Sequence, residues 1–249
     1  LGYAEADPTV DVGGHDTAHK LAILSSLAYG FNVDSDQLFC EGIDGLEIAD
    51  IEYARELGYT IKLLGISQRS GDGVSVRVHP TMIPDTSVLA NVNDAFNAVA
   101  VVGDAVGPTL YYGQGAGELP TASAVVADII DAARVVVTGS PAEIPSCWDP
   151  NRAKAMAIDP MDSCESSYYL RLQVEDRPGV LADIGAILGR HAISMSAVIQ
   201  KAPHCEDSVP LVLLTHRALE ANLQAALREI SDLPCTRQPN VCIRVETDL

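Results

Sequence analysis

Residues 5–20 read EADPTVDVGGHDTAHK, and residues 21–30 continue as LAILSSLAYG. The first part carries four carboxylates, Glu5, Asp7, Asp11 and Asp16, followed by Lys20. The second part is apolar on nearly every side of a helix, which is typical of a helix buried inside a domain. The stretch therefore predicts acids and a lysine at the edge of a hydrophobic core.

Asp16 and Lys20 are four residues apart, so on a helix they share one face, and Ile23 and Leu27 continue that face. We therefore expect Lys20 to be partly buried. One interpretation is an ordinary surface ion pair, worth a few tenths of a kcal/mol. The other is functional: burial favours the neutral amine, nearby carboxylates hold the proton on, and the lysine can exchange a proton near neutral pH.

A second motif is the glycine-rich turn Gly113-Gln114-Gly115-Ala116-Gly117, which precedes a predicted helix at residues 121–137. A strand, a glycine turn and a helix also occur in dinucleotide-binding units. However, residues 140–145 read SPAEIP, a linker, where such a unit continues with a second strand. The turn alone is not a Rossmann unit, and its glycines fit either a close ligand or tight packing.

Charge and composition restrict the class of protein. Among 249 residues there are 16 basic and 34 acidic ones, a formal charge of −18, which disfavours nucleic acid and anionic membranes as partners. No apolar run approaches the roughly 20 residues that a bilayer requires, and no signal peptide is evident, so we expect a soluble cytoplasmic protein. The six cysteines lack metal-ligand spacing, which predicts free thiols and no metal site.

The pattern along the chain predicts an α+β fold in two domains. Residues 1–140 predict a mostly antiparallel sheet covered by helices, with a hairpin at 61–80 and further strands at 96–102 and 109–112. Residues 141–166 have no periodic pattern and predict a linker. Residues 167–249 alternate in the order βαββαβ, which is typical of a ferredoxin-like unit.

Both parts resemble known families. The motif Glu-x-Asp-Pro-x-x-Asp-x-x-Gly-x-Asp-x-x-x-Lys-Leu at residues 5–21, with the glycine turn and Pro120-Thr121-Ala122, resembles homoserine dehydrogenase over most of residues 1–137. The turn Asp176-Arg177-Pro178-Gly179-Val180-Leu181 in its βαββαβ setting resembles the ACT domain, an amino-acid-sensing module. The same turn is also explained as a simple helix start, with Pro178 in its first turn.

The resemblance implies an oxidoreductase of threonine and methionine biosynthesis that interconverts L-homoserine and L-aspartate 4-semialdehyde with NAD or NADP. It implies that Lys20 is the catalytic proton donor and acceptor. Histidines 15 and 19 are spacer positions in the motif. The implied binding residues are Glu5 and Asp16 for the substrate with Asp7 and Asp11 in support, and Gly2 and Gly117 for the cofactor.

The resemblance also implies a longer protein. Homoserine dehydrogenases begin with a nucleotide-binding domain, and this chain opens at Leu1 without an initiator methionine, so we expect the fragment alone to be inactive. The ACT-like unit at residues 167–249 implies allosteric inhibition, with threonine as effector, and a homodimer or larger assembly. Two alternatives stay open: a non-catalytic amino-acid sensor with a degenerate dehydrogenase domain, and a dimerisation scaffold.

Overall fold

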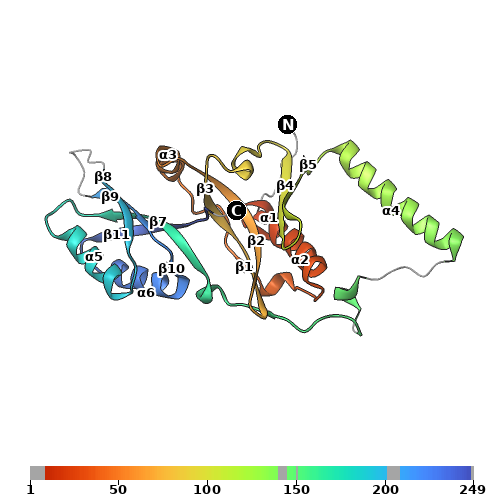
Figure 1. Cartoon of the computed structure of the whole chain (residues 1–249). Coiled ribbons are helices and arrows are strands. Elements are labelled where there is room, and N and C mark those ends of the chain that lie inside the picture. The colour runs from red at the N-terminus through yellow and green to blue at the C-terminus, as the bar shows by residue number, and fades with distance from the viewer. Residues whose placement is uncertain (1–8, 140–144, 150, 201–207, 248–249) are drawn as a thin grey trace.

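The computed structural model describes residues 9–139, 145–149, 151–200 and 208–247 (Figure 1). The helices are α1 (Thr9–Val12), α2 (His15–Tyr29), α3 (Ile48–Glu56), α4 (Glu118–Thr138), α5 (Val180–Arg190) and α6 (Glu220–Ser231). The strands are β1 (Phe39–Cys40), β2 (Tyr59–Ser70), β3 (Gly73–Pro84), β4 (Phe96–Gly103), β5 (Gly107–Gln114), β6 (Ala157–Ile158), β7 (Glu165–Val174), β8 (Met195–Gln200), β9 (Val209–Thr215), β10 (Ala218–Leu219) and β11 (Thr236–Val245).

The N-terminal unit, residues 9–139, is built on the long antiparallel hairpin of β2 and β3. The two strands pair without interruption from Tyr59 opposite Pro84 to Ser70 opposite Gly73. Gly71 at the tip has a φ of +56°, a left-handed conformation that favours glycine. This confirms the hairpin predicted at residues 61–80. Helix α2 packs on β3 through a cluster of buried apolar residues that includes Ala18, Leu21, Ala22, Val74, Val76 and Val78.

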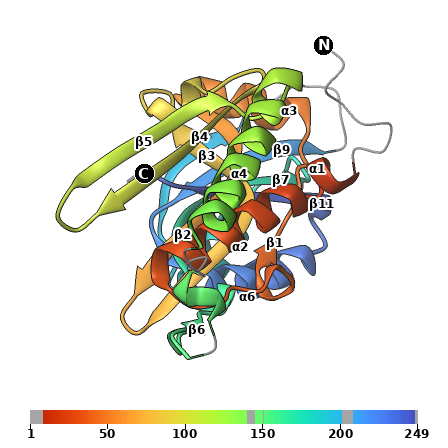
Figure 2. The same ribbon diagram turned by 90° about the vertical axis from the view of Figure 1, so that its right-hand side faces the viewer.

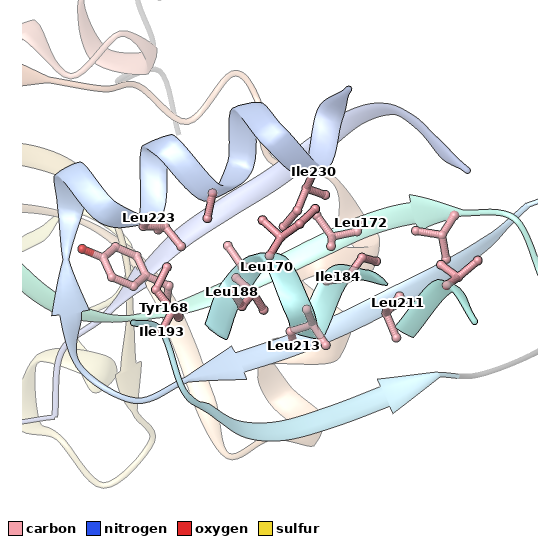
Figure 3. Packing of buried hydrophobic residues seen from close by; sticks show 14 of the residues in the cluster. Tyr168, Leu170, Leu172, Ile184, Leu188, Ile193, Leu211, Leu213, Leu223 and Ile230 are labelled. Atoms are coloured by element: carbon pink, nitrogen blue, oxygen red, sulfur yellow. The ribbon is translucent and has the colours of Figure 1, made fainter. Parts of the chain in front are cut away.

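The C-terminal unit, residues 165–247, has the predicted βαββαβ order: β7, α5, β8, β9, α6 and β11. Alternate side chains of β7 point to one side of its sheet, where α5 and α6 cover them (Figure 3). The labelled residues of this core are Tyr168, Leu170, Leu172, Ile184, Leu188, Ile193, Leu211, Leu213, Leu223 and Ile230. Because alternate residues of β7 enter this core, the sequence shows the period-two pattern from which the strand was predicted.

The two units share one sheet. Strand β11 pairs in parallel with β3, Arg244 opposite Thr81 and Val245 opposite Met82, so the strand order runs β1-β3-β11-β7-β9-β8 with β2 on β3. We call this junction the seam. Buried apolar residues from both units form its core: Ala54, Met82, Tyr169, Val212, Ile243 and Val245. The units are therefore joined by backbone pairing and by a common core, in addition to the covalent connection.

Buried charges cross the seam beside this core. The carboxylate of Asp50 on α3 accepts hydrogen bonds from Arg171 on β7, with Nε to Oδ1 at 2.7 Å and Nη2 to Oδ2 at 3.0 Å. It also accepts one from the Tyr169 hydroxyl at 3.0 Å. Asp50 is fully buried, and its hydrogen bonds are the chief reason that the pKa of the Arg171 guanidinium is raised. The carboxylate is thus fully paired in a site without water contact.

The β4–β5 hairpin and α4 stand apart from this sheet. The hairpin forms its own two-stranded sheet, and none of the 21 residues of α4 is buried. Figure 1 shows α4 on the outside of the molecule, at the end away from the C-terminal unit, and Figure 2 shows it along its length. Apolar side chains are exposed on both elements, among them Tyr111 on β5 and Ile129 on α4.

The segment expected to be an irregular linker contains short regular pieces among its described residues. Strand β6 pairs in parallel with the start of β3, and Ser146–Trp148 and Met161–Ser163 each form one turn of 3-10 helix. Lys154 N–H also donates to the Gly30 carbonyl at 2.9 Å, at the end of α2. The connection is therefore attached to the N-terminal unit and does not run free between two domains.

The pairing of Asp50 yields a stability prediction. Replacing Asp50 with Ala leaves Arg171 buried without its main partner, and removal of one member of a buried ion pair costs about 3 to 5 kcal/mol. We expect the free energy of unfolding of Asp50→Ala, measured with urea, to fall by that amount. Glu52→Ala, on the exposed side of the same helix, is the control and changes it by less than about 0.5 kcal/mol. Equal effects of the two substitutions would contradict this account.

Candidate functional site

The predicted catalytic helix begins at a tight glycine turn. Gly14 is the N-cap of α2 with a φ of +81°, and its carbonyl accepts the N–H of Ala18 at 2.9 Å. The preceding turn is closed by Gly13 N–H to the Thr9 carbonyl at 2.8 Å. A Cβ at position 14 would lie 3.2 Å from the Cys40 sulfur and 3.3 Å from Val78 Cγ1. Both the backbone angle and the space therefore require glycine here.

The segment Phe39–Ile43 packs against this turn. Its backbone is fixed to β3 by Glu41 N–H donating to the Val78 carbonyl at 2.9 Å, and Ile43 N–H donates to the Val12 carbonyl at 2.9 Å. The Cys40 thiol donates to the Gly13 carbonyl at 3.4 Å, and burial raises the pKa of this thiol, which favours the protonated donor. A Cβ on Gly42 would collide with the Val12 carbonyl.

The segment Phe39–Ile43 was not singled out in the sequence analysis. The signal that could have found it is Gly42, directly after the strand residues Phe39 and Cys40. A glycine at the end of a strand often marks a place where another backbone approaches closely. Here that backbone is the glycine turn at the start of α2.

Asp16 and Lys20 meet on the first two turns of α2. Lys20 Nζ donates to Asp16 Oδ2 at 2.5 Å, and the side chains are 59% and 43% exposed. The pair is thus formed as the spacing predicts, with the acid on the N-terminal side. In this contact the lysine amine lies over the first turn of the helix.

The burial predicted for α2 is wrong for the described residues. Only one side of the helix is buried, through Ala18, Leu21 and Ala22, whereas Ile23 is 53% and Leu27 50% exposed. Lys20 lies on the same open side, so it is not partly buried as expected. The surface of α2 is apolar on nearly every side, but the described part of the chain covers only one side of it.

The other predicted site residues are only partly placed. Gly2, Glu5 and Asp7 lie outside the described residues. Asp11 is exposed on α1, and the structure gives its carboxylate no hydrogen bond or ion pair to another described residue. Among the predicted residues that the structure describes, it brings together Asp16 and Lys20.

The glycine turn after β5 shows tight packing at one position. A Cβ on Gly115 would overlap the side-chain amide of Asn97, whereas one on Gly113 would meet no described atom within 4 Å. Gly117 is the N-cap of α4 with a φ of +126°, so it is needed for the chain to turn into the helix. Packing and backbone conformation therefore explain Gly115 and Gly117 within the described chain.

The described residues do not enclose a substrate site around Lys20. Neither of two hollows, of about 390 and 330 Å³, is lined by Asp16 or Lys20. Within the same residues no group of three or more His, Cys, Asp or Glu side chains is arranged to hold a metal ion. None of the helices described is long and apolar enough to span a membrane.

Comparison with known proteins identifies the family. The family model described as homoserine dehydrogenase matches residues 1–130, slightly more than half of the 249 residues. The chain belongs to the homoserine dehydrogenase family. The ACT domain model matches residues 168–235, which agrees with the βαββαβ unit. Both resemblances drawn from the sequence motifs are therefore confirmed.

Individual homoserine dehydrogenases are similar over the whole chain. Those of Neisseria gonorrhoeae and Pseudomonas aeruginosa are 48% and 47% identical over 99% of this chain. A crystal structure of the homoserine dehydrogenase from Thiobacillus denitrificans covers 99% of this chain at 48% identity with a TM-score of 0.91. The chain spans only 57% of the length of those two relatives and 56% of the crystallised protein.

The start of α2 generates a second prediction. Alanine at position 14 must adopt a left-handed conformation and press against Cys40, which costs about 1 to 2 kcal/mol for the backbone alone. We expect Gly14→Ala to lower the free energy of unfolding by about 2 kcal/mol. Gly45→Ala is the matched control, because a Cβ there meets nothing within 4 Å, and its effect should stay below about 0.5 kcal/mol. A neutral Gly14→Ala would show that the turn is not constrained.

Proposed function

We propose that this chain is the catalytic and regulatory part of a homoserine dehydrogenase, which interconverts L-homoserine and L-aspartate 4-semialdehyde. The observation that carries the proposal is the Asp16–Lys20 pair at the start of α2, inside the part of the chain that matches the family. An isolated surface pair contributes little stability, so stability alone gives little reason for it. Its position in the family's motif favours the functional interpretation.

Lys20 is the proposed general acid and general base of the reaction. The terminal oxygen of the substrate gains a proton when the aldehyde is reduced and loses one when the alcohol is oxidised, and the lysine amine supplies or accepts it. Asp16 holds the amine in place by the 2.5 Å hydrogen bond. With Glu5, it also binds the ammonium group of the amino-acid substrate, and Asp7 and Asp11 add negative charge around that group.

NAD or NADP supplies the hydride acceptor and donor when bound. The described residues do not fit a dinucleotide site by themselves, because the turn before α4 follows an antiparallel hairpin strand and Asn97 fills the space at Gly115. We therefore assign dinucleotide binding mainly to the part of the relatives that this chain does not span, with contacts from Gly2 and Gly117. The open apolar side of α2 supports a covering domain there, since Ile23 and Leu27 are exposed.

The proposal is tested on the intact enzyme by replacing Lys20. We expect Lys20→Ala to lower kcat by about 100-fold or more, with a smaller change in KM for the cofactor, because an acid–base group acts in the chemical step. Lys154→Ala is the control: that lysine is exposed, and its side chain makes no hydrogen bond or ion pair to a described residue. A Lys20→Ala enzyme with nearly normal kcat would remove Lys20 from its role.

We further propose that the C-terminal unit makes the enzyme threonine-sensitive, as a cytoplasmic homodimer or larger assembly. The match to the ACT domain over residues 168–235 supports an amino-acid effector. The turn before α5 supports a site there, because Gly179 has a φ of +95° and leads directly into the helix N-terminus. Backbone N–H groups at such a terminus can bind a carboxylate.

Calorimetric titration of the intact enzyme with L-threonine tests this regulation. We expect saturable binding accompanied by inhibition, and we expect both to weaken in Gly179→Ala, because a side chain strains the left-handed turn. Gly189→Ala, near the other end of α5, is the control, since a Cβ there meets no described atom within 4 Å. Absence of threonine binding and of inhibition in the unaltered enzyme would refute the regulatory proposal without affecting the catalytic one.

A further inference from the structure

The turn that begins α2 is connected to the C-terminal unit through one glutamate. Glu41 lies in the segment Phe39–Ile43, whose backbone contacts Val12, Gly13 and Gly14. Its carboxylate Oε2 accepts a hydrogen bond from Arg244 Nη1 at 2.7 Å. Arg244 belongs to β11, 203 residues further along the chain. A residue of the C-terminal unit therefore holds the support of the proposed catalytic helix.

Arg244 is itself held rigidly. Its side chain is 3% exposed, and that of its partner Glu220 on α6 is 2% exposed. Nε donates to Glu220 Oε2 at 3.0 Å and Nη2 to Glu220 Oε1 at 2.6 Å, a bidentate pair with fixed geometry. The guanidinium also lies 4.9 Å from the centre of the Phe39 ring, a cation–π distance. Its third nitrogen, Nη1, is thereby directed to Glu41.

We propose that Arg244 and Glu41 are positioning residues for Asp16 and Lys20. They act through the segment Phe39–Ile43, which sets the glycine turn and so the start of α2. The sequence of contacts is continuous: Glu220, Arg244, Glu41, the backbone of residues 40–43, then the carbonyls of Val12 and Gly13. Because Lys20 lies in the second turn of this helix, which begins at His15, a shift of the glycine turn moves its amine. This inference rests on the proposed function of Lys20.

Glu41 is the better of the two residues to replace. Arg244→Ala would leave Glu220 buried and unpaired and could unfold the protein. Glu41 is 40% exposed, so its loss leaves Arg244 with Glu220 and costs little stability. Glu229 on α6 is a matched control: it is 43% exposed and accepts a hydrogen bond from Arg190 at 2.7 Å, within the C-terminal unit.

The first experiment does not depend on activity. Amide hydrogen exchange of this chain, followed by mass spectrometry, should show at least about threefold faster exchange in peptides covering residues 9–20 for Glu41→Ala, and no change for Glu229→Ala. Unchanged exchange at residues 9–20 in Glu41→Ala would overturn the proposal. This result stands even if the intact protein proves to have no dehydrogenase activity, a failure that belongs to the proposed function alone.

The second experiment uses the intact enzyme. We expect Glu41→Ala to lower kcat about tenfold, because small displacements of catalytic groups slow the chemical step. The midpoint of thermal unfolding should fall by less than about 4 °C, since a half-exposed ion pair contributes little stability. Glu41→Gln keeps an oxygen acceptor for Arg244 and should restore kcat to within about threefold of the unaltered enzyme. Unchanged kcat in Glu41→Ala, or a Gln variant as slow as the Ala variant, would overturn the positioning role; the latter would indicate that the charge itself acts.

Discussion

The parallel pairing of β11 with β3 is the constraint on which the rest of this structure depends. It is short, with Arg244 opposite Thr81 and Val245 opposite Met82, and Glu246 N–H adds a bond to the Met82 carbonyl at 3.0 Å. Yet it joins a sheet of the N-terminal unit to one of the C-terminal unit and closes a buried core between them. Domain contacts within a chain are usually more polar and allow relative motion. A shared sheet with a shared apolar core allows much less.

Charges at the seam fix how the two units meet. Arg77 of the N-terminal unit pairs with Glu246 of the C-terminal unit, whereas Arg171 of the C-terminal unit pairs with Asp50 of the N-terminal unit. Each unit thus contributes an arginine that pairs with a carboxylate of the other unit. Any other register of the seam would leave these buried charges unpaired. Such pairs add little net stability over an apolar core, but they select one arrangement among several with similar burial.

His79 shows the electrostatic result of this arrangement. It is fully buried on β3, and burial together with the nearby positive charges of Arg244 and Arg77 lowers the pKa of its imidazole to about 3. The ring is therefore neutral wherever the protein is folded near neutral pH. A protonated imidazole beside these two arginines would add a third positive charge to a buried site that is balanced without it.

The sequence predicted what is local and missed what is distant. The hairpin of β2 and β3 followed from alternation and from Ser70-Gly71-Asp72-Gly73, and the βαββαβ order followed from its periodicity. Those signals lie within a few residues of each other. The pairing of β11 with β3 has no such signal, because its register is set by side chains that become neighbours only after folding. The sequence pattern predicted two domains with a linker. It did not reveal the sheet that joins them.

In the candidate site, too, the local contact was predictable from the sequence and the burial was not. Spacing alone placed Asp16 next to Lys20, since four residues on a helix determine the contact. Burial was not predictable, because periodicity tells which residues are apolar but not which of them become covered, and Ile23 and Leu27 stay 53% and 50% exposed among the described residues. This difference bears on the chemistry. Proton transfer between an amine and a substrate oxygen needs the two groups in hydrogen-bond contact, in a site from which bulk water is excluded. The proposed acid–base role of Lys20 therefore requires that the open side of α2 be covered when substrate is bound.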